Sequence, residues 1–267
     1  MVVKRLMRMF GVGGPSVRTE LTVSRAKPGG KLTGTVEVTG GDHQVSIGYI
    51  ALVLVTDVGV QGGLLGDQST GEISRQKVVE GFTLAARERR IFDIACDVPL
   101  ETPLTRAFGQ PIAGMNVGLR TELEVARAVD RTDLDPVEID PMPAQQHILD
   151  ALTKLGFQFV KAHMEKGRLR GLPQTLPFYQ EIEFLPGAAY AAQVRNLEVT
   201  FVATDRKLHV VMELDRKVGP LADRDIFGRF TVDPATLADT DWRGLLQDWL
   251  AQSTTRKGPC SDRPFPR

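Results

Sequence analysis

Hydrophobic and polar residues alternate with a period of two along most of the first half of the chain. In residues 31–39 apolar side chains alternate with threonine, lysine and glutamate, which is typical of a half-buried strand. Residues 49–58 are apolar on both faces and rich in β-branched side chains, as in a central strand. Residues 92–98 and 115–125 repeat the alternation, and glycine or proline separates the runs. Short strands with turn signals at this spacing predict an antiparallel β-sandwich.

The same period returns beyond Gly156 and predicts a second antiparallel β-sandwich. Apolar positions again alternate with glutamate, threonine, lysine and histidine. The strands are expected at residues 178–184, 197–201, 208–214 and 226–232.

Residues 130–143 interrupt the alternation between the two sandwiches. Acidic residues and prolines fill this segment, and proline fixes φ and removes a backbone donor. We therefore expect a stiff connector that marks a domain boundary. A helix then begins at Pro143 and ends at Gly156, and its apolar face is expected to bury at the seam between the domains. The apolar positions of this helix are Ile148, Leu149, Leu152 and Leu155.

These patterns predict an all-β protein with a few short helices, in which two antiparallel β-sandwich domains follow one another. The C-terminal tail, residues 253–267, has no apolar periodicity and is expected to be disordered. The expected divisions are an N-terminal sandwich with a short helix over residues 1–135, a linker and connecting helix over 136–156, a C-terminal sandwich over 157–233, a C-terminal helix over 234–252 and a disordered tail over 253–267.

Apolar and basic residues in the first ten positions fit a short amphipathic helix. This helix either docks on the protein's own sheet or makes a reversible contact with a membrane surface or a partner, because basic amphipathic segments bind anionic surfaces. The candidate contact residues are Lys4, Arg5, Leu6, Arg8 and Phe10.

A second amphipathic helix is expected near the C-terminus, with Thr240 or Asp241 as its N-cap. Its apolar residues form one stripe at helical spacing and include both tryptophans of the chain. The stripe either packs on its own domain or is exposed as a groove-binding partner site. Its residues are Trp242, Leu245, Leu246, Trp249 and Leu250.

Composition narrows the class of protein. Hydrophobic residues make up 42% of the 267 residues and charged residues 25%, which suits a packed globular chain. Lys and Arg balance Asp and Glu at 33 each, so the net charge is zero, which argues against a nucleic-acid partner. The only cysteines, Cys96 and Cys260, fit a reducing compartment. No secretory signal or apolar span of helix length is visible, so we expect a cytoplasmic protein.

No catalytic motif occurs in the chain, and the four histidines are scattered without partners at metal-ligand spacing. A calcium loop of the EF-hand type beginning at Asp133 would need glycine where Glu138 stands. We therefore expect no enzyme activity, no cofactor and no metal. A hydrolase with an unfamiliar site remains an alternative, and a cleft that joins His163 or His209 to a nucleophile would identify it.

Charged residues gather on the polar face of the second sandwich. They form either a solvated face or, with charges of the first domain, a latch between two domain orientations. The face is expected to carry Glu181, Glu183, Arg195, Glu213, Asp215, Arg216 and Arg229, and the latch candidates are Arg120, Arg127, Asp215 and Arg216.

Several segments together resemble the sporulation-control SpoOM family, in the right order over roughly residues 1 to 233. The first half contributes MVVKRLM (1–7), GVGGPSV (11–17), KPGGKLTGTVEV (27–38), GLRTELEVARAVD (118–130) and DLDP (133–136). The second half contributes LTKLGF (152–157), FYQEIEF (178–184) and VMELDR (211–216). The resemblance implies an arrestin-like fold, a regulatory role in bacterial development or stress response, and no catalysis.

The first functional hypothesis is therefore a cytoplasmic regulator or adaptor. It would bind protein partners through sheet edges, the domain seam or the terminal helices. The alternative is a sandwich module that binds a small molecule, a carbohydrate or a metal. An aromatic content of only 6% argues against a carbohydrate platform.

Overall fold

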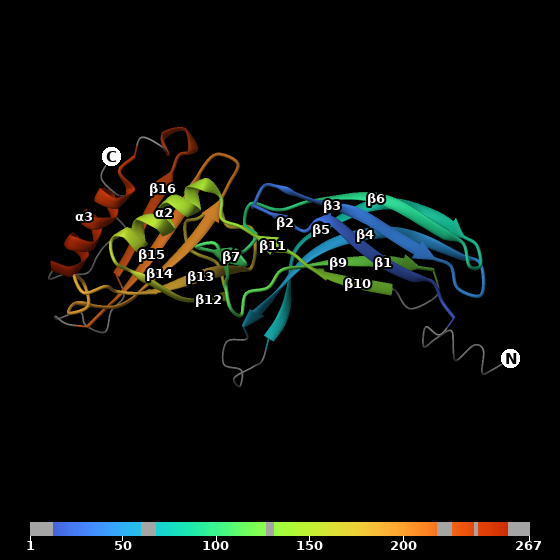
Figure 1. The fold of residues 1–267 in the computed structure, drawn as a ribbon, viewed down its shortest axis with the longest axis horizontal. Coiled ribbons are helices and arrows are strands. Elements are labelled where there is room, and N and C mark those ends of the chain that lie inside the picture. Colours follow the sequence, from blue (N-terminus) through green and yellow to red (C-terminus); the bar gives the residue numbers. More distant parts are fainter. Residues whose placement is uncertain (1–12, 60–67, 127–130, 218–225, 238–239, 256–267) are drawn as a thin grey trace. The chain divides into compact units, whose positions relative to one another are not determined.

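The computed structural model describes residues 13–59, 68–126, 131–217, 226–237 and 240–255 (Figure 1). The chain divides into two compact units, and each is described by itself. The first comprises residues 1–57, 70–102 and 116–139, and the second comprises residues 58–69, 103–115 and 140–267. Segments 58–69 and 103–115 thus belong to the second unit, although the sequence placed them within the first domain.

The first unit is a β-sandwich of two antiparallel sheets. One sheet has the strand order β1-β3-β6 and the other β10-β9-β4-β5, and the short β2 and β11 form a parallel pair. The strands are β1 (Ser16–Val23), β2 (Arg25–Ala26), β3 (Lys31–Thr39), β4 (Val45–Gly59), β5 (Gln68–Leu84), β6 (Arg89–Asp97), β9 (Gly118–Val125), β10 (Arg131–Pro136) and β11 (Glu138–Ile139).

Side-chain hydrogen bonds join the two sheets of this sandwich along both sides. On one side Thr19 of β1 donates its backbone N–H to the Asp133 carboxylate of β10 at 2.7 Å. The Thr19 and Thr121 hydroxyls lie 2.6 Å apart beside it. On the other side the Gln76 side chain of β5 bonds the backbone N–H and C=O of Asp97 at 3.1 and 2.8 Å. Polar side-chain contacts therefore link the two sheets at both borders of the sandwich.

The acidic segment expected as a connector is partly a strand. Residues 131–136 form β10, which pairs antiparallel with β9, and the unit ends after Ile139. Pro136 lies at the end of this outer strand, where a missing N–H is tolerated. The strand was concealed because prolines and acidic residues are typical of turns. Asp133 does not form a turn but accepts a hydrogen bond from β1.

The second unit is built on one five-stranded antiparallel sheet with the order β12-β13-β14-β15-β16. Apolar residues from all five strands face one side, and Ile182, Val199 and Met212, aligned in register, are fully buried there. The elements of this unit are β7 (Arg106–Ala107), β8 (Gln110–Pro111), α2 (Pro143–Lys154), β12 (Gln158–Lys166), β13 (Phe178–Leu185), β14 (Val194–Ala203), β15 (Leu208–Arg216), β16 (Ile226–Val232), the 3-10 helix η1 (Pro234–Thr236) and α3 (Trp242–Thr255).

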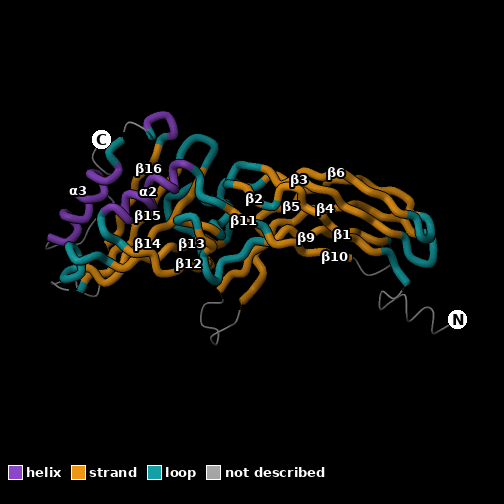
Figure 2. The backbone as a smooth tube through the Cα atoms, in the orientation of Figure 1, coloured by secondary structure: helices purple, strands orange, loops and turns teal. Residues whose placement is uncertain are grey.

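Helices α2 and α3 supply the second layer of this unit (Figure 2). Helix α2 begins at Pro143 and is followed by Gly156 at a φ of 92°, as its sequence predicts. It contacts α3 and β12, so its buried face packs within the second unit. Asp241 caps α3, because its carboxylate accepts the Gly244 N–H at 3.0 Å.

The predicted fold class, mostly β with a few short helices, is confirmed. The second unit differs from the expected sandwich, because helices α2 and α3 form the layer over its described five-stranded sheet (Figure 2). The predicted runs 31–39, 178–184 and 226–232 coincide with β3, β13 and β16 to within a residue or two. Strand β9 begins only at Gly118, later than the expected residue 115. Helix α3 continues through Thr255, beyond the expected end at 252, and residues 256–267 lie outside the described part. Among the described residues, no helix is both long and apolar enough to cross a membrane.

Candidate functional site

The outer face of the four-stranded sheet carries a cavity of about 270 Å³. Strand β4 turns Ala51, Val53 and Val55 toward this face, because they pair in register with Glu122, Arg120 and Gly118 of β9. All three are buried although the face lies opposite the sandwich core. The residues that line the cavity are Val55, Thr56, Asp57, Thr70, Asn116, Val117, Gly118, Arg120, Leu134 and Pro136.

Leu134 is the exposed apolar residue of this cavity. The residue is 61% exposed, and its side chain lies over Gly118, where an added Cβ atom would lie 2.7 Å from Leu134 Cδ1. On the polar side the Asn116 amide donates to the Asp57 carboxylate at 2.5 Å and accepts the Asp57 N–H at 3.1 Å. The cavity therefore combines apolar walls with a fixed polar end, a composition that suits binding of an apolar group.

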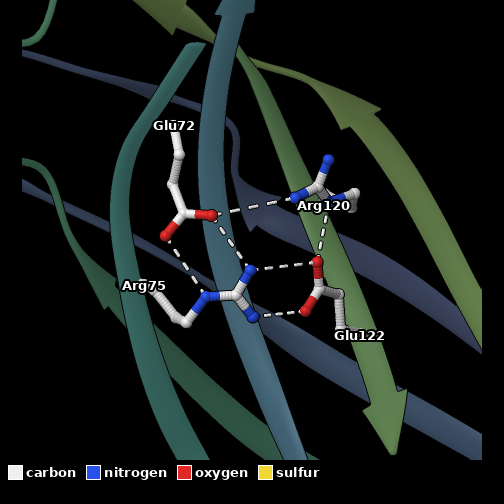
Figure 3. A network of polar contacts seen from close by, with 4 residues as sticks. All are labelled: Glu72, Arg75, Arg120 and Glu122. Atoms are coloured by element: carbon white, nitrogen blue, oxygen red, sulfur yellow. Dashed lines mark hydrogen bonds and ion pairs between the residues drawn. The ribbon is translucent and has the colours of Figure 1, made fainter. Parts of the chain in front are cut away.

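An ion-pair network lies beside the cavity and includes the predicted latch residue Arg120 (Figure 3). Arg75 of β5 contacts Glu122 of β9 across β4, and it also binds Glu72 with Nη2–Oε2 at 2.9 Å. Arg120 Nε donates to Glu122 at 2.9 Å. Hydrogen bonding to Arg75 lowers the pKa of Glu122, so the carboxylate is ionised at neutral pH. Ala51, directly opposite Glu122 on β4, is small enough to leave room for these side chains above the strand.

The other latch candidates do not lie on one face. Asp215 pairs with Arg195 at 3.0 Å. Arg216 lies on the opposite, helix-covered face, is only 4% exposed and donates to the Thr254 carbonyl of α3 at 3.1 Å. Its expected place on the polar face is wrong, because successive residues of a strand point to opposite faces. Arg127 lies outside the described residues. The latch between the units remains a prediction.

The tryptophan stripe of α3 faces its own unit. Leu246 and Leu250 are fully buried, and the Trp242 ring stacks on Phe230 of β16 with ring centroids 6.1 Å apart. The Trp242 indole N–H donates to the Leu237 carbonyl at 3.0 Å. Of the two interpretations, the structure favours docking on the helix's own domain, and partner binding by this stripe would require undocking. The basic N-terminal candidates, residues 4–10, lie outside the described residues.

The polar face of the five-stranded sheet brings together residues that the sequence left scattered. His163 of β12 is aligned with Glu181 of β13, and its Nε2 lies 3.2 Å from the Glu181 carboxylate and 3.3 Å from that of Glu165. The hydrogen bond to Glu181 raises the pKa of His163. Burial and surrounding carboxylates raise the pKa of Tyr179 on the same face to about 12. The spacing of His163 and Glu165 along one strand is visible in the sequence and places both side chains on one face. The strand register that brings Glu181 beside them is not visible in the sequence.

The described residues offer little support for the hydrolase alternative. Neither His163 nor His209 lines the cavity of the first unit. The ion-pair partners of His163 are glutamates, and burial lowers the pKa of His209. Cys96 is fully buried, and burial raises its pKa to about 11, which keeps the thiol protonated at neutral pH.

Comparison with known proteins identifies the family. A family model described as "SpoOM protein" matches residues 3–218. The chain belongs to the SpoOM family. A curated SpoOM relative, "Sporulation-control protein spo0M" of Bacillus subtilis (strain 168), is 29% identical over 215 residues, which cover 80% of each chain.

A solved SpoOM structure agrees with this assignment. The crystal structure of Spo0M, sporulation control protein, from Bacillus subtilis matches with a TM-score of 0.77 and 26% identity. The match covers 90% of this chain and 99% of that chain. The resemblance seen in the sequence is therefore confirmed, and SpoOM membership supports a regulatory role in sporulation.

Proposed function

We propose that this protein is a non-enzymatic regulator that acts by binding protein partners in bacterial development or stress response. The observation that carries the proposal is the cavity on the outer face of the four-stranded sheet. An outward-facing row of a sheet strand is ordinarily polar, yet β4 presents Ala51, Val53 and Val55 there. Beside these buried residues Leu134 is exposed, and exposed apolar surface rimmed by polar groups is typical of a protein-interaction site.

The geometry fits an apolar side chain of a partner. Leu134 would be covered on binding, and the cavity floor at Val55 would receive the partner's side chain. Arg120 and Asp57 at the rim would orient the partner through hydrogen bonds. Burying one large aliphatic side chain on each partner contributes about 1.5–3 kcal/mol per side chain, which is enough for a hot spot of a regulatory complex.

Two single substitutions of matched exposure test the proposal. Leu134→Asp places a charge at the cavity, whereas Ile91→Asp changes an exposed residue on β6 of the other sheet. The native residues are 61% and 55% exposed. Each variant would replace the native gene, and development, stress survival and the set of cross-linked partners would be measured. We expect Leu134→Asp to lose both phenotype and partners and Ile91→Asp to retain them.

Equal behaviour of the two variants, with both folded by circular dichroism, would refute docking at this cavity. Turnover by the purified protein that disappears on substitution of a cavity residue would refute the non-enzymatic part of the proposal.

A further inference from the structure

Three side chains of the second unit converge on one point of the open sheet face. His163 and Glu165 leave β12 on the same side, and Glu181 lies opposite His163 on β13. Their ligand atoms all lie within 4.8 Å of one another, and each side chain is half-buried. The imidazole Nε2 is 3.3 Å from Glu165 Oε1 and 3.2 Å from Glu181 Oε2.

We propose that His163, Glu165 and Glu181 bind one divalent transition-metal ion. Zn²⁺ is the ion whose geometry is compared with the site and which is used to test it. In a tetrahedral site with ligand bonds of about 2.0–2.1 Å, neighbouring ligand atoms are about 3.3–3.4 Å apart. The two distances from Nε2 match this edge without movement of the backbone. A nitrogen ligand together with carboxylates favours zinc or another first-row metal over calcium or magnesium. The fourth position would be filled by water.

The charge around these ligands favours a doubly charged ion. Glu183, Glu198 and Glu213 lie directly opposite one another on three adjacent strands of the same face. Like charges directly opposite one another destabilise a sheet, and a divalent ion beside them would reduce this repulsion. Carboxylate oxygens of Glu198 and Glu213 also lie within 4.8 Å of a Glu181 oxygen, so the second group shares Glu181 with the first.

Two basic residues of this face are paired with other carboxylates. Lys161 contacts Glu183 at 3.2 Å, and Arg195 contacts Asp215 at 3.0 Å. The imidazole of His163 is the basic group that lies between Glu165 and Glu181. When protonated it carries one positive charge, which cannot balance the two negative charges of the carboxylates. A divalent ion at the same point would balance both carboxylates and leave the imidazole neutral.

Zinc binding to the metal-free, full-length chain tests the proposal. All proteins would carry Cys260→Ser, which removes a thiol outside the described residues. Isothermal titration at pH 7.5 should give one Zn²⁺ per chain for this parent. His163→Ala should weaken binding by about 100-fold, since loss of a ligand's supporting partner alone costs about 10–100-fold. His209→Ala, which removes another histidine of the same sheet face, should bind as the parent does.

A spectrum and a second variant keep the test decisive. Co²⁺ bound to the parent should show the visible bands of a tetrahedral nitrogen and oxygen site, and these should vanish in His163→Ala. Glu165→Gln, on the outer strand, replaces His163→Ala if that variant does not fold, and should also weaken binding by at least tenfold. Binding of less than one ion by the parent, equal binding by both histidine variants, or tighter binding of Ca²⁺ than of Zn²⁺ would overturn the assignment.

Discussion

Trp249 of helix α3 lies directly against Gly228 of strand β16. A Cβ atom added at Gly228 would lie 2.5 Å from Cε2 of the indole, closer than side chains tolerate. The glycine thus provides the space in which the helix docks on its sheet. We predict that Gly228→Ala lowers the free energy of unfolding by about 1–3 kcal/mol, the usual cost of overpacking.

Urea unfolding followed by tryptophan fluorescence measures this effect, because both tryptophans of the chain lie on α3. Gly59→Ala is the control, since its nearest contact would be an ordinary 3.4 Å to the Met164 carbonyl. If both variants unfold at the same urea concentration as the wild type, Trp249 does not pack tightly against Gly228.

Arg216 and Arg195 provide a second comparison. Arg216 is buried and donates to the Thr254 carbonyl near the end of α3, whereas Arg195 makes an exposed ion pair with Asp215. Arg216→Ala should lower the free energy of unfolding by about 1.5–3 kcal/mol and increase amide exchange in the last turn of α3. Arg195→Ala should cost less than about 1 kcal/mol. A reversed order of the two costs would contradict the burial assigned to Arg216.

The network around Glu122 predicts an acid-dependent stability. Hydrogen bonding to Arg75 lowers the folded-state pKa of Glu122, so its contribution is complete above the unfolded value of about 4.3 and is lost as the pH falls through the folded value. Arg75→Met should therefore be less stable than wild type at pH 7, and the difference should shrink between about pH 5 and 3. Urea unfolding at several pH values measures it, and a difference independent of pH would count against the network.

His163 predicts a titration in the opposite direction. Its pKa is raised chiefly by the hydrogen bond to Glu181, with help from Glu165 and against the effect of Lys161. The imidazolium therefore stabilises the fold below its unfolded pKa of about 6.5, and this contribution is lost as the pH rises through the folded value. In metal-free protein with chelator, nuclear magnetic resonance should show His163 titrating above His209, whose pKa burial lowers.

Glu181→Gln removes the main cause of this shift. The titration of His163 should then move toward lower pH, while that of His209 should not change. An unchanged His163 titration would show that Glu181 does not accept its proton.

The local elements could be predicted because their signals lie within one stretch of sequence. The fully buried run in β4 and the helix between Pro143 and Gly156 depend on neighbours a few residues apart, and both were found. Helix α3 was likewise found from its apolar spacing. Strand β10 was missed because its proline and aspartates have the composition of a turn, and only pairing with β9 makes it a strand.

The sites could not be predicted because they depend on register. His163 and Glu181 meet across a hairpin whose connection is held by Gln174, which donates to the Gly167 and Leu176 carbonyls at 2.9 and 2.7 Å. Nothing local in the sequence fixes that alignment. The cavity beside Leu134 similarly requires β4, β9 and β10 in one sheet, with Gly118 below the leucine.

The bond between Asp133 and Thr19 has a consequence for behaviour at high concentration. Outer strands with free amides recruit further strands and so promote fibril growth. The Asp133 carboxylate accepts the Thr19 N–H at 2.7 Å, so this amide cannot pair with another strand, and the edge carries a negative charge. Association of two chains edge to edge through this part of β1 is thereby disfavoured.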